Sequence, residues 1–146
     1  MALSTDYSTS ASRSHSSQLD PKNIDLTYLD EAYWFEQNDR FDKQIQDKFG
    51  GIWEAAKQGE CVSWRIAESS LDGNSSITAL AGRLAEIIVL DQFSRNLCRG
   101  QASAFAQDGM ALALAQEAIQ QPYFDTLPMQ WRRFIIIPFM HSESAM

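Results

Sequence analysis

The chain of 146 residues has little cysteine and no long apolar run. Cys61 and Cys98 do not form a CxxC pair, which indicates reduced thiols in a cytoplasmic protein rather than a disulfide framework. The longest apolar runs, IIVL and FIIIPFM, are too short to cross a membrane. The N-terminus has neither a basic start nor an apolar stretch typical of a signal peptide. We therefore expect a cytoplasmic protein with no membrane partner.

Basic residues and histidines are also scarce. The 12 lysines and arginines face 19 acidic residues, so the net charge is −7 and nucleic-acid binding is not expected. Only two histidines occur, and no metal site can be recognised from their spacing. A glycine-rich phosphate loop and a GxSxG motif are absent as well. We expect no metal and no cofactor, and the oligomeric state stays open.

What the chain does contain is the composition of one globular domain behind a polar tail. Seven serines fall within residues 1–20, and residues 1–24 are expected to form a flexible tail because they bury too little surface to offset their ordering entropy. Residues 25–146 are expected to form a single helical domain, since 45% of the chain is hydrophobic and the apolar residues recur at helical spacing. Aromatic residues at that spacing, Phe105 among them, are expected in the core.

Five helices follow from the apolar periodicity and from the residues that start and stop helices. They are predicted over residues 23–37, 40–59, 77–93, 109–121 and 128–141. Short loops join them, so the fold class is all-α with antiparallel helix pairs. A short helical turn is expected around Trp64.

Four details of these helices can be tested against a structure. Asn38 or Asp39 caps the second helix, which the double glycine at positions 50 and 51 would bend or split. Asp108 is expected to cap the fourth helix. Pro138 is expected to interrupt the last one, because it lacks the amide that bonds to the preceding turn.

The central helix ends in the stretch LDQFSRNLCRG, which carries charges where apolar residues are expected. On a helical wheel, the stripe of Ile77, Leu80, Leu84 and Ile88 continues to Asp91 and Arg95, so both are predicted to point inward. The wheel places Arg83 and Glu86 on the opposite face, in solvent.

Two interpretations of the inward charges stay open. In the first, Arg95 and Gln92 satisfy free carbonyls of the helix end and Asp91 holds the arginine, which is a structural role. In the second, Arg95 and Arg99 present two planar guanidinium groups to a carboxylate or phosphate. We favour the structural interpretation, because buried ion pairs are more often structural than functional.

A second polar cluster, PFMHSES, follows near the C-terminal end. His141 falls on the inner side of its helix, and a single histidine there is most often a core residue with satisfied hydrogen bonds. The alternative is that His141 acts as a catalytic acid or base with Glu143 as its partner.

Three stretches, WFEQNDRFDKQIQDKFG, LAEIIVLDQFSRNLCRG with AFAQDGMALALA, and PFMHSES, resemble the DUF924 family of uncharacterised bacterial proteins. The resemblance covers about residues 33–144. It implies a superhelix of antiparallel helix pairs similar to tetratricopeptide repeats, and no activity. The family's signature positions correspond here to Asp91, Gln92, Phe93, Arg95, Asn96, Arg99, Gly100, Pro138, His141, Ser142 and Glu143.

The chain departs from the family pattern at Ser94, where proline is usual, and at both ends. It lacks the usual aromatic FWF start, and the family continues with further helices after HSE, so a truncated or divergent member is expected.

Two main functions follow as hypotheses. One is a binding module for a peptide, a protein or a small anionic ligand, with Asp91, Gln92, Arg95, Asn96 and Arg99 as the ligand-binding residues. The other is a small-molecule enzyme of unknown reaction, with His141 and Glu143 as the catalytic residues. A third possibility is that these polar motifs only stabilise helix ends. The fold alone does not decide among them.

Overall fold

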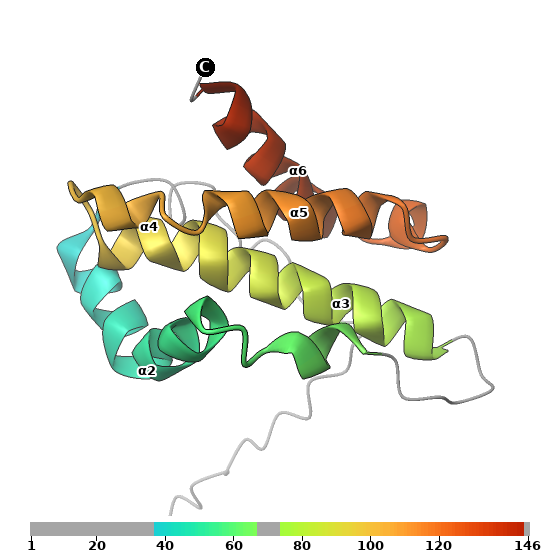
Figure 1. Cartoon of the computed structure of the whole chain (residues 1–146), viewed down its shortest axis with the longest axis horizontal. Helices are drawn as coiled ribbons and strands as arrows, with labels where there is room; N and C mark the ends of the chain where they lie inside the picture. The colour runs from blue at the N-terminus through green and yellow to red at the C-terminus, as the bar shows by residue number, and fades with distance from the viewer. Residues whose placement is uncertain (1–36, 67–73, 145–146) are drawn as a thin grey trace, which may run out of the picture.

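The structure, a computed structural model, describes residues 37–66 and 74–144. Every regular element within these two ranges is a helix, which confirms the all-α class there (Figure 1). The predicted tail and residues 23–36 of the first predicted helix lie outside the described residues. The division of the chain into a tail and one domain therefore stays a prediction.

Helix α2 (Asp39–Lys57) begins and ends at the predicted signals. Its N-cap is Asn38, whose side chain accepts a hydrogen bond of 3.0 Å from the backbone amide of Phe41. Just beyond its C-terminus, Gly59 has a φ of 78°, a left-handed conformation that glycine adopts without strain. The double glycine does not split the helix, because the burial of Ile45 and Ala56 on its apolar face outweighs the low helix propensity of two glycines.

The 3-10 turn η2 (Val62–Arg65) confirms the helical turn predicted around Trp64. It lies against the next helix so closely that a Cβ atom added to Gly82 would be 1.7 Å from the carbonyl oxygen of Trp64. Only a residue without a side chain permits this approach. Gly82 therefore determines how near the turn lies to the central helix.

The central helical run has three parts. Helix α3 (Asn74–Ile88) continues directly into the π-helix η3 (Val89–Phe93) and then into the short helix α4 (Ser94–Leu97). The helix predicted over residues 77–93 is therefore confirmed and continues to Leu97. The five π-helical residues were not predicted, and segments of this kind often occur at functional sites.

The remaining elements are η4 (Ala102–Ala104), α5 (Asp108–Ile119), η5 (Phe124–Thr126) and α6 (Met129–Ser144). Helix α6 continues through Pro138, so the predicted interruption there is wrong. The proline removes one backbone hydrogen bond, but burial of Phe134 and Ile135 on one side, and a contact of His141 on the other, hold the helix in place.

The helices pack around α3 and its continuation (Figure 1). Helix α5 lies along α3 and runs in the opposite direction, and α6 packs against both. Helix α2 contacts η3 and α4, whereas η2 lies against α3. The end of the central helical run is therefore covered from several directions.

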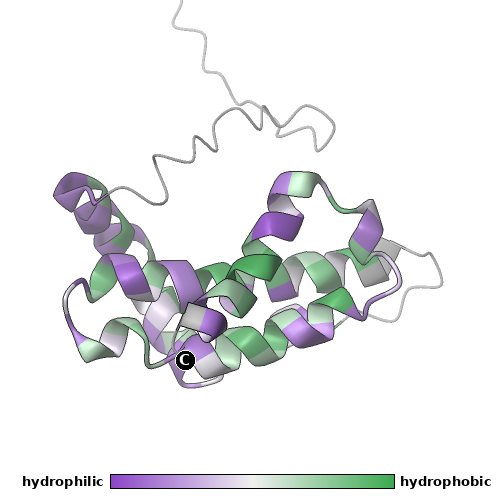
Figure 2. Cartoon of the chain, turned by 90° about the horizontal axis from the view of Figure 1, so that it is seen from above, coloured by the Kyte–Doolittle hydropathy of each residue, from purple (hydrophilic) through white to green (hydrophobic). Residues whose placement is uncertain are grey.

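Apolar side chains fill the space between these helices. Leu80, Ile87, Leu90, Leu114 and Ile135 are fully buried. Each helix carries both apolar and polar segments (Figure 2). Burial of each of these large side chains contributes about 1.5–3 kcal/mol to stability.

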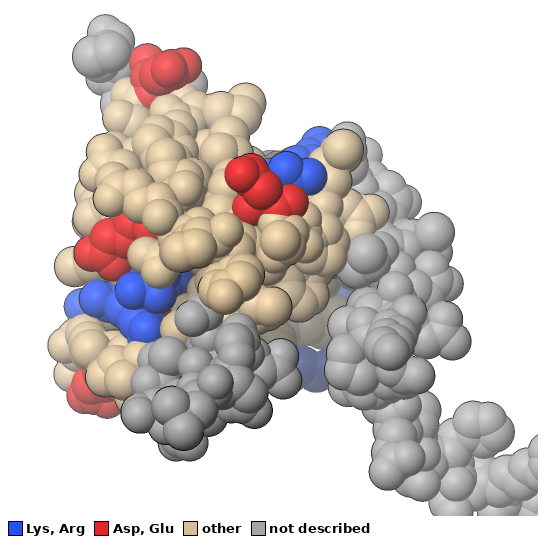
Figure 3. Space-filling model, turned by 90° about the vertical axis from the view of Figure 1, so that its right-hand side faces the viewer, with Lys and Arg blue, Asp and Glu red and all other residues tan. Residues whose placement is uncertain are grey.

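The burial pattern overturns several predictions, among them the expected burial of Phe49, which is exposed. Phe105 is 60% exposed and does not belong to the core, because it lies in the loop between η4 and α5 rather than on a helix face. Ile77, which the wheel placed on the inner stripe, is also exposed. On the face shown in Figure 3, basic and acidic side chains lie next to one another in small groups, and uncharged surface separates these groups.

Candidate functional site

The carboxylate of Asp91 is the centre of a polar cluster at the end of the central helical run. Its side chain is only 1% exposed, which confirms the prediction that it points inward. It accepts hydrogen bonds from Gln92 Nε2 at 2.7 Å and Arg95 Nη1 at 3.0 Å, and His141 Nδ1 lies 2.8 Å away. Three side-chain partners meet the rule that a buried carboxylate must be paired and hydrogen-bonded.

The π-helix η3 positions Asp91 and its neighbours. All five of its residues are buried. The backbone carbonyl of Asp91 accepts a hydrogen bond of 3.0 Å from Arg95 Nη1, so this arginine serves both the carboxylate and the carbonyl of one residue. Arg95 thus does satisfy a helix carbonyl, as the structural interpretation predicted. Gln92 binds the carboxylate of Asp91.

Arg95 also binds a second carboxylate, which the sequence interpretation missed. Its Nη1 and Nη2 atoms donate to Asp108 Oδ1 and Oδ2 at 2.9 and 3.0 Å, a bidentate pair. The predicted role of Asp108 as a helix cap is wrong, because it is the first residue of α5 and the cap position is Gln107, which makes no side-chain cap hydrogen bond. Binding to Arg95 ties the start of α5 to the end of the central helix.

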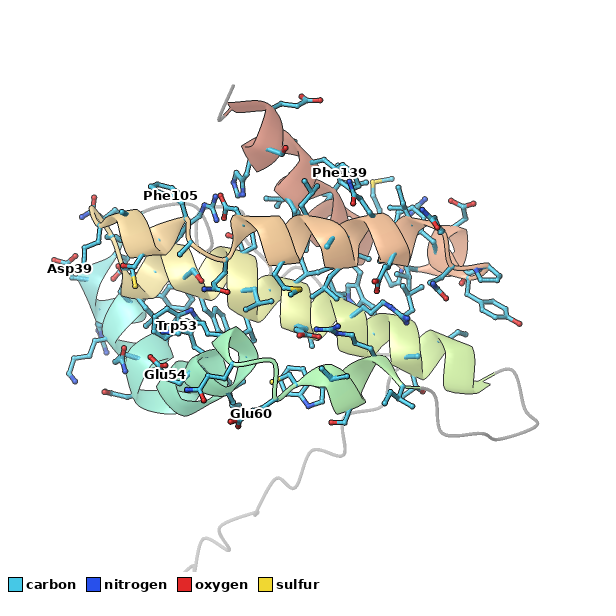
Figure 4. The ribbon with its side chains drawn as sticks, viewed as in Figure 1. Asp39, Trp53, Glu54, Glu60, Phe105 and Phe139 are labelled. Carbon is cyan, nitrogen blue, oxygen red and sulfur yellow. The ribbon has the colours of Figure 1, made fainter. Side chains whose placement is uncertain are left out.

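Ser94, which follows the π-helix, joins α2 to the same region. Trp53 Nε1 donates to Ser94 Oγ at 2.9 Å, and Ser94 Oγ donates to the carbonyl of Leu90 at 2.6 Å. Figure 4 shows Trp53 extending from α2 toward the central helical run. The buried hydroxyl satisfies the indole N–H and so fixes the position of α2 against η3.

Asn96 and Arg99 form a separate cluster with Asp42 of α2. Asn96 Nδ2 donates to Asp42 Oδ1 at 2.8 Å, and Arg99 binds the same carboxylate through Nε and Nη2. Burial raises the pKa of Asp42. The hydrogen bonds from Arg99 and Asn96 and the charge of Arg99 together lower it by more, so the pKa lies below the usual 3.8. The hydrogen bond from Arg99 to Asp42 likewise raises the pKa of the guanidinium.

Asp42 was also missed, although the sequence contains a signal for it. It precedes the buried Ile45 by three positions, which places both on the same face of α2. An acid on an apolar helix face, facing a motif with two arginines, indicates an ion pair between helices. The five predicted ligand-binding residues therefore fall into two clusters, one around Asp91 and one around Asp42.

His141 and Glu143 do not form the predicted pair. The carboxylate that His141 contacts is that of Asp91, fifty positions earlier, whereas Glu143 is exposed near the end of α6. The side chain of His141 is 27% exposed, so the imidazole lies between the buried carboxylate and the surface. A carboxylate accepts hydrogen bonds, so it favours the tautomer with the proton on Nδ1, which leaves Nε2 as the acceptor.

Another ion pair has its carboxylate in α3, five positions before Asp91. Glu86 is fully buried, and Arg65 of η2 donates to its two oxygens through Nε and Nη2, both at 2.6 Å. The prediction that Glu86 faces solvent is wrong, because η2 covers that side of the helix. The hydrogen bonds that Arg65 donates to Glu86 raise the pKa of Arg65.

The cysteines lie in buried positions. Burial raises the pKa of Cys61, and the neighbouring charges of Glu86 and Glu60 raise it further, so this thiol stays protonated at neutral pH. Cys61 is therefore unsuited to act as a nucleophile. Within residues 37–66 and 74–144, no three histidine, cysteine or acidic side chains are grouped so that they could hold a metal ion.

Fold and site together define an all-helical protein in which a buried carboxylate joins an arginine, an amide and a histidine at the end of its central helix. Residues 25–146 match the family described as bacterial protein of unknown function (DUF924). The chain belongs to this family, which confirms the resemblance seen in its motifs.

The fold is also similar to that of a solved structure, the protein of unknown function ATU0120 from Agrobacterium tumefaciens. The two share 29% identity with a TM-score of 0.65 over 79% of this chain and 58% of that one. This chain thus spans less than two thirds of the length of that relative. The search of curated proteins found no match to this chain. In the described part of the chain, no helix is long and apolar enough to span a membrane.

Proposed function

We propose that this protein binds a small molecule at the Asp91 cluster and that His141 exchanges a proton with it. The observation that carries the proposal is the contact of 2.8 Å between His141 Nδ1 and Asp91 Oδ1. A buried carboxylate that orients a partly exposed imidazole is a common arrangement for a general base. This arrangement favours the enzymatic hypothesis, with Asp91 in the place predicted for Glu143.

The chemistry of the pair follows from its surroundings. Gln92 and Arg95 hold the Asp91 carboxylate, and that carboxylate in turn orients the imidazole. Because Nδ1 faces Asp91, Nε2 is the ring nitrogen that can accept a proton from a ligand. The geometry therefore identifies a proton acceptor, Nε2 of His141.

An anionic ligand, expected from the two arginines, has less support. Arg95 is bound to both Asp91 and Asp108, and Arg99 is bound to Asp42, so both guanidinium charges are already compensated. A ligand with a strong negative charge would have to compete with these carboxylates. A small polar ligand without a strong charge suits the cluster better.

The tautomer of His141 provides a direct test. The chain has only one other histidine, His15, so a long-range ¹H–¹⁵N spectrum of the imidazole rings can be assigned with a single substitution. We expect His141 to carry its proton on Nδ1, and Asp91→Asn to abolish this preference because an amide can also donate. A His141 ring with its proton on Nε2 in the wild-type protein would contradict the proposal.

A ligand screen provides the functional test. Compounds that raise the melting temperature of the wild-type protein are retested with His141→Gln, which keeps a polar side chain and removes the proton acceptor. Glu143→Gln is the matched control, because Glu143 is exposed two positions further along the same helix. True ligands lose their effect with His141→Gln and keep it with Glu143→Gln. Equal effects in both variants would contradict the proposal.

Binding of a protein or peptide is the second candidate function. Met129, Ile136 and Met140 are exposed and share one face of α6, and apolar helix faces of this kind often contact partners. A superhelix of helix pairs, as the family resemblance implies, would present such a face. A partner that binds the wild-type protein and is lost with Ile136→Glu and Met140→Glu would support this candidate.

A cytoplasmic location is part of the same proposal. Cys61 and Cys98 are both free thiols, which a reducing compartment preserves. Fractionation of cells that express the tagged protein would test it.

A further inference from the structure

Phe105 is an exposed aromatic residue that lies against the Asp91 cluster. Its side chain is 60% exposed, and the guanidinium carbon of Arg95 lies 5.4 Å from the centre of its ring. Figure 4 shows Phe105 in the segment that joins α4 to α5, at the end of the central helical run. The cation–π contact with Arg95 thus holds an apolar ring beside the polar cluster while most of the ring stays in solvent.

The loop that carries Phe105 is held in place from both sides. The Phe105 amide donates to the carbonyl of Ala102 at 3.1 Å, and its carbonyl accepts from the amide of Asp108 at the same distance. The Asp108 side chain holds Arg95 in a bidentate pair. The ring is therefore anchored to the guanidinium group rather than carried on a free loop.

Arg95 connects this ring to the proton-accepting histidine. Its Nη1 atom and His141 Nδ1 contact the same oxygen, Oδ1 of Asp91. The imidazole and the guanidinium group are thus neighbours, and the ring of Phe105 lies against the guanidinium group. All three side chains are partly exposed, so an aromatic ring, a guanidinium edge and an imidazole are arranged next to one another at the surface.

Building on the proposed function, we propose that Phe105 is the stacking platform of this site and that the ligand is a planar, uncharged aromatic molecule with an O–H or N–H group. The ring binds the flat face of the ligand, and His141 Nε2 accepts a hydrogen bond from its O–H or N–H. Aromatic pairs stack with offset geometry, and a hydrogen-bonding group at the edge of such a ligand gives the specificity.

The charges around the ring explain why the ligand is uncharged. Arg95 lies over the ring of Phe105, and this positive charge disfavours a cationic ligand on the ring. Asp91 and Asp108 outnumber Arg95 in the same cluster, and they disfavour an anionic one. A neutral planar molecule avoids both penalties.

Phenol and cyclohexanol form a matched pair of probes, because each has one hydroxyl group on a six-membered ring and only phenol is planar. We would titrate each probe into the wild-type protein and follow the imidazole signals of His141 by NMR. We expect a saturable shift with phenol and at least a threefold weaker one with cyclohexanol. Phe105→Leu, which keeps an apolar side chain, should reduce this preference to near unity.

Tyr123→Leu is the control, since it removes a partly exposed aromatic ring just before η5 and should leave the preference unchanged. If Phe105→Leu retains the wild-type preference for phenol, the platform is wrong while the role of His141 stands. If phenol does not shift the His141 signals of the wild-type protein, the ligand class is wrong. The tautomer measurement described above decides the proposed function independently of both results.

Discussion

Asp91 and His141 are fifty positions apart in the chain, and their side chains meet at 2.8 Å between Oδ1 and Nδ1. The contact joins the π-helical turn of the central helical run to the last turns of α6. Because Asp91 is enclosed and also binds Gln92 and Arg95, the contact belongs to a network and not to an isolated pair. The stability of the helix end and the position of the histidine therefore depend on the same carboxylate.

Replacement of Asp91 by alanine is expected to destabilise the protein strongly. Arg95 then loses one of its two carboxylate partners, and Gln92 loses the acceptor of its hydrogen bond. Loss of one partner of a buried pair typically costs about 3–5 kcal/mol. Urea denaturation followed by circular dichroism measures the change. Asp47→Ala, which breaks the exposed pair with Lys43, should cost less than about 1 kcal/mol. Similar losses in both variants would show that the cluster stabilises the protein no more than an exposed ion pair does.

The buried pair of Arg65 and Glu86 is expected to behave as a unit. Glu86→Ala leaves Arg65 partly buried without its carboxylate, at a cost of about 3–5 kcal/mol. The double variant Arg65→Met and Glu86→Met should recover most of this loss, because apolar side chains of similar length replace both charges. Free energies of unfolding from denaturant titrations test the pair. A double variant no more stable than Glu86→Ala would mean that the hydrogen-bond geometry itself is required.

Gly82→Ala is expected to displace η2 from α3. The added methyl group would meet the Trp64 carbonyl at 1.7 Å, and overpacking of this kind costs about 1–3 kcal/mol or more. Gly51→Ala is the matched control, because nothing lies within 4 Å of the added atom and alanine favours the helix by about 0.5–1 kcal/mol. Opposite shifts in melting temperature are expected. Equal shifts would contradict the close packing of η2.

The pair of Asp42 and Arg99 should contribute a stability that depends on pH. The pKa of Asp42 is lower in the folded protein than its usual 3.8, so the folded state binds fewer protons near that pH than the unfolded state does. The contribution is complete above the unfolded-state pKa and is lost as the pH falls through the folded-state pKa.

Asp42→Asn makes this contribution measurable. Near neutral pH the variant should be less stable than the wild-type protein, and the difference should shrink once the pH falls below about 4. Urea midpoints at a series of pH values give the difference directly. A difference that stays constant across the acidic range would show that the charge of Asp42 has no effect on stability.

The local structure of this protein could be predicted well from its sequence. Asn38 supplies the hydrogen bond of a helix cap, and Asp91 continues the buried stripe of the central helix. Both features depend on residues a few positions apart, whose relative directions follow from the helical repeat. The inward direction of Asp91 and the place of His141 on the inner side of α6 could therefore be predicted.

Glu86, Asp108 and Pro138 show the limit of such reasoning. A helical wheel gives the direction of Glu86 but not the fact that η2 covers that side of α3. Likewise, Asp108 occupies a position typical of a helix cap, yet Arg95 offers it a stronger, bidentate partner. Helix α6 continues past Pro138 because tertiary contacts on both sides of the proline compensate for one lost hydrogen bond.

The helical character of the described chain, the places of its main helices and the inward direction of Asp91 could be predicted from the sequence alone. These properties arise from spacing over one or two turns of a helix. The contact of His141 with Asp91 and that of Phe105 with Arg95 follow from the tertiary structure and not from local spacing. Such partners meet only when helices that are distant in the sequence pack together, and this packing depends on the shape and burial of the whole core.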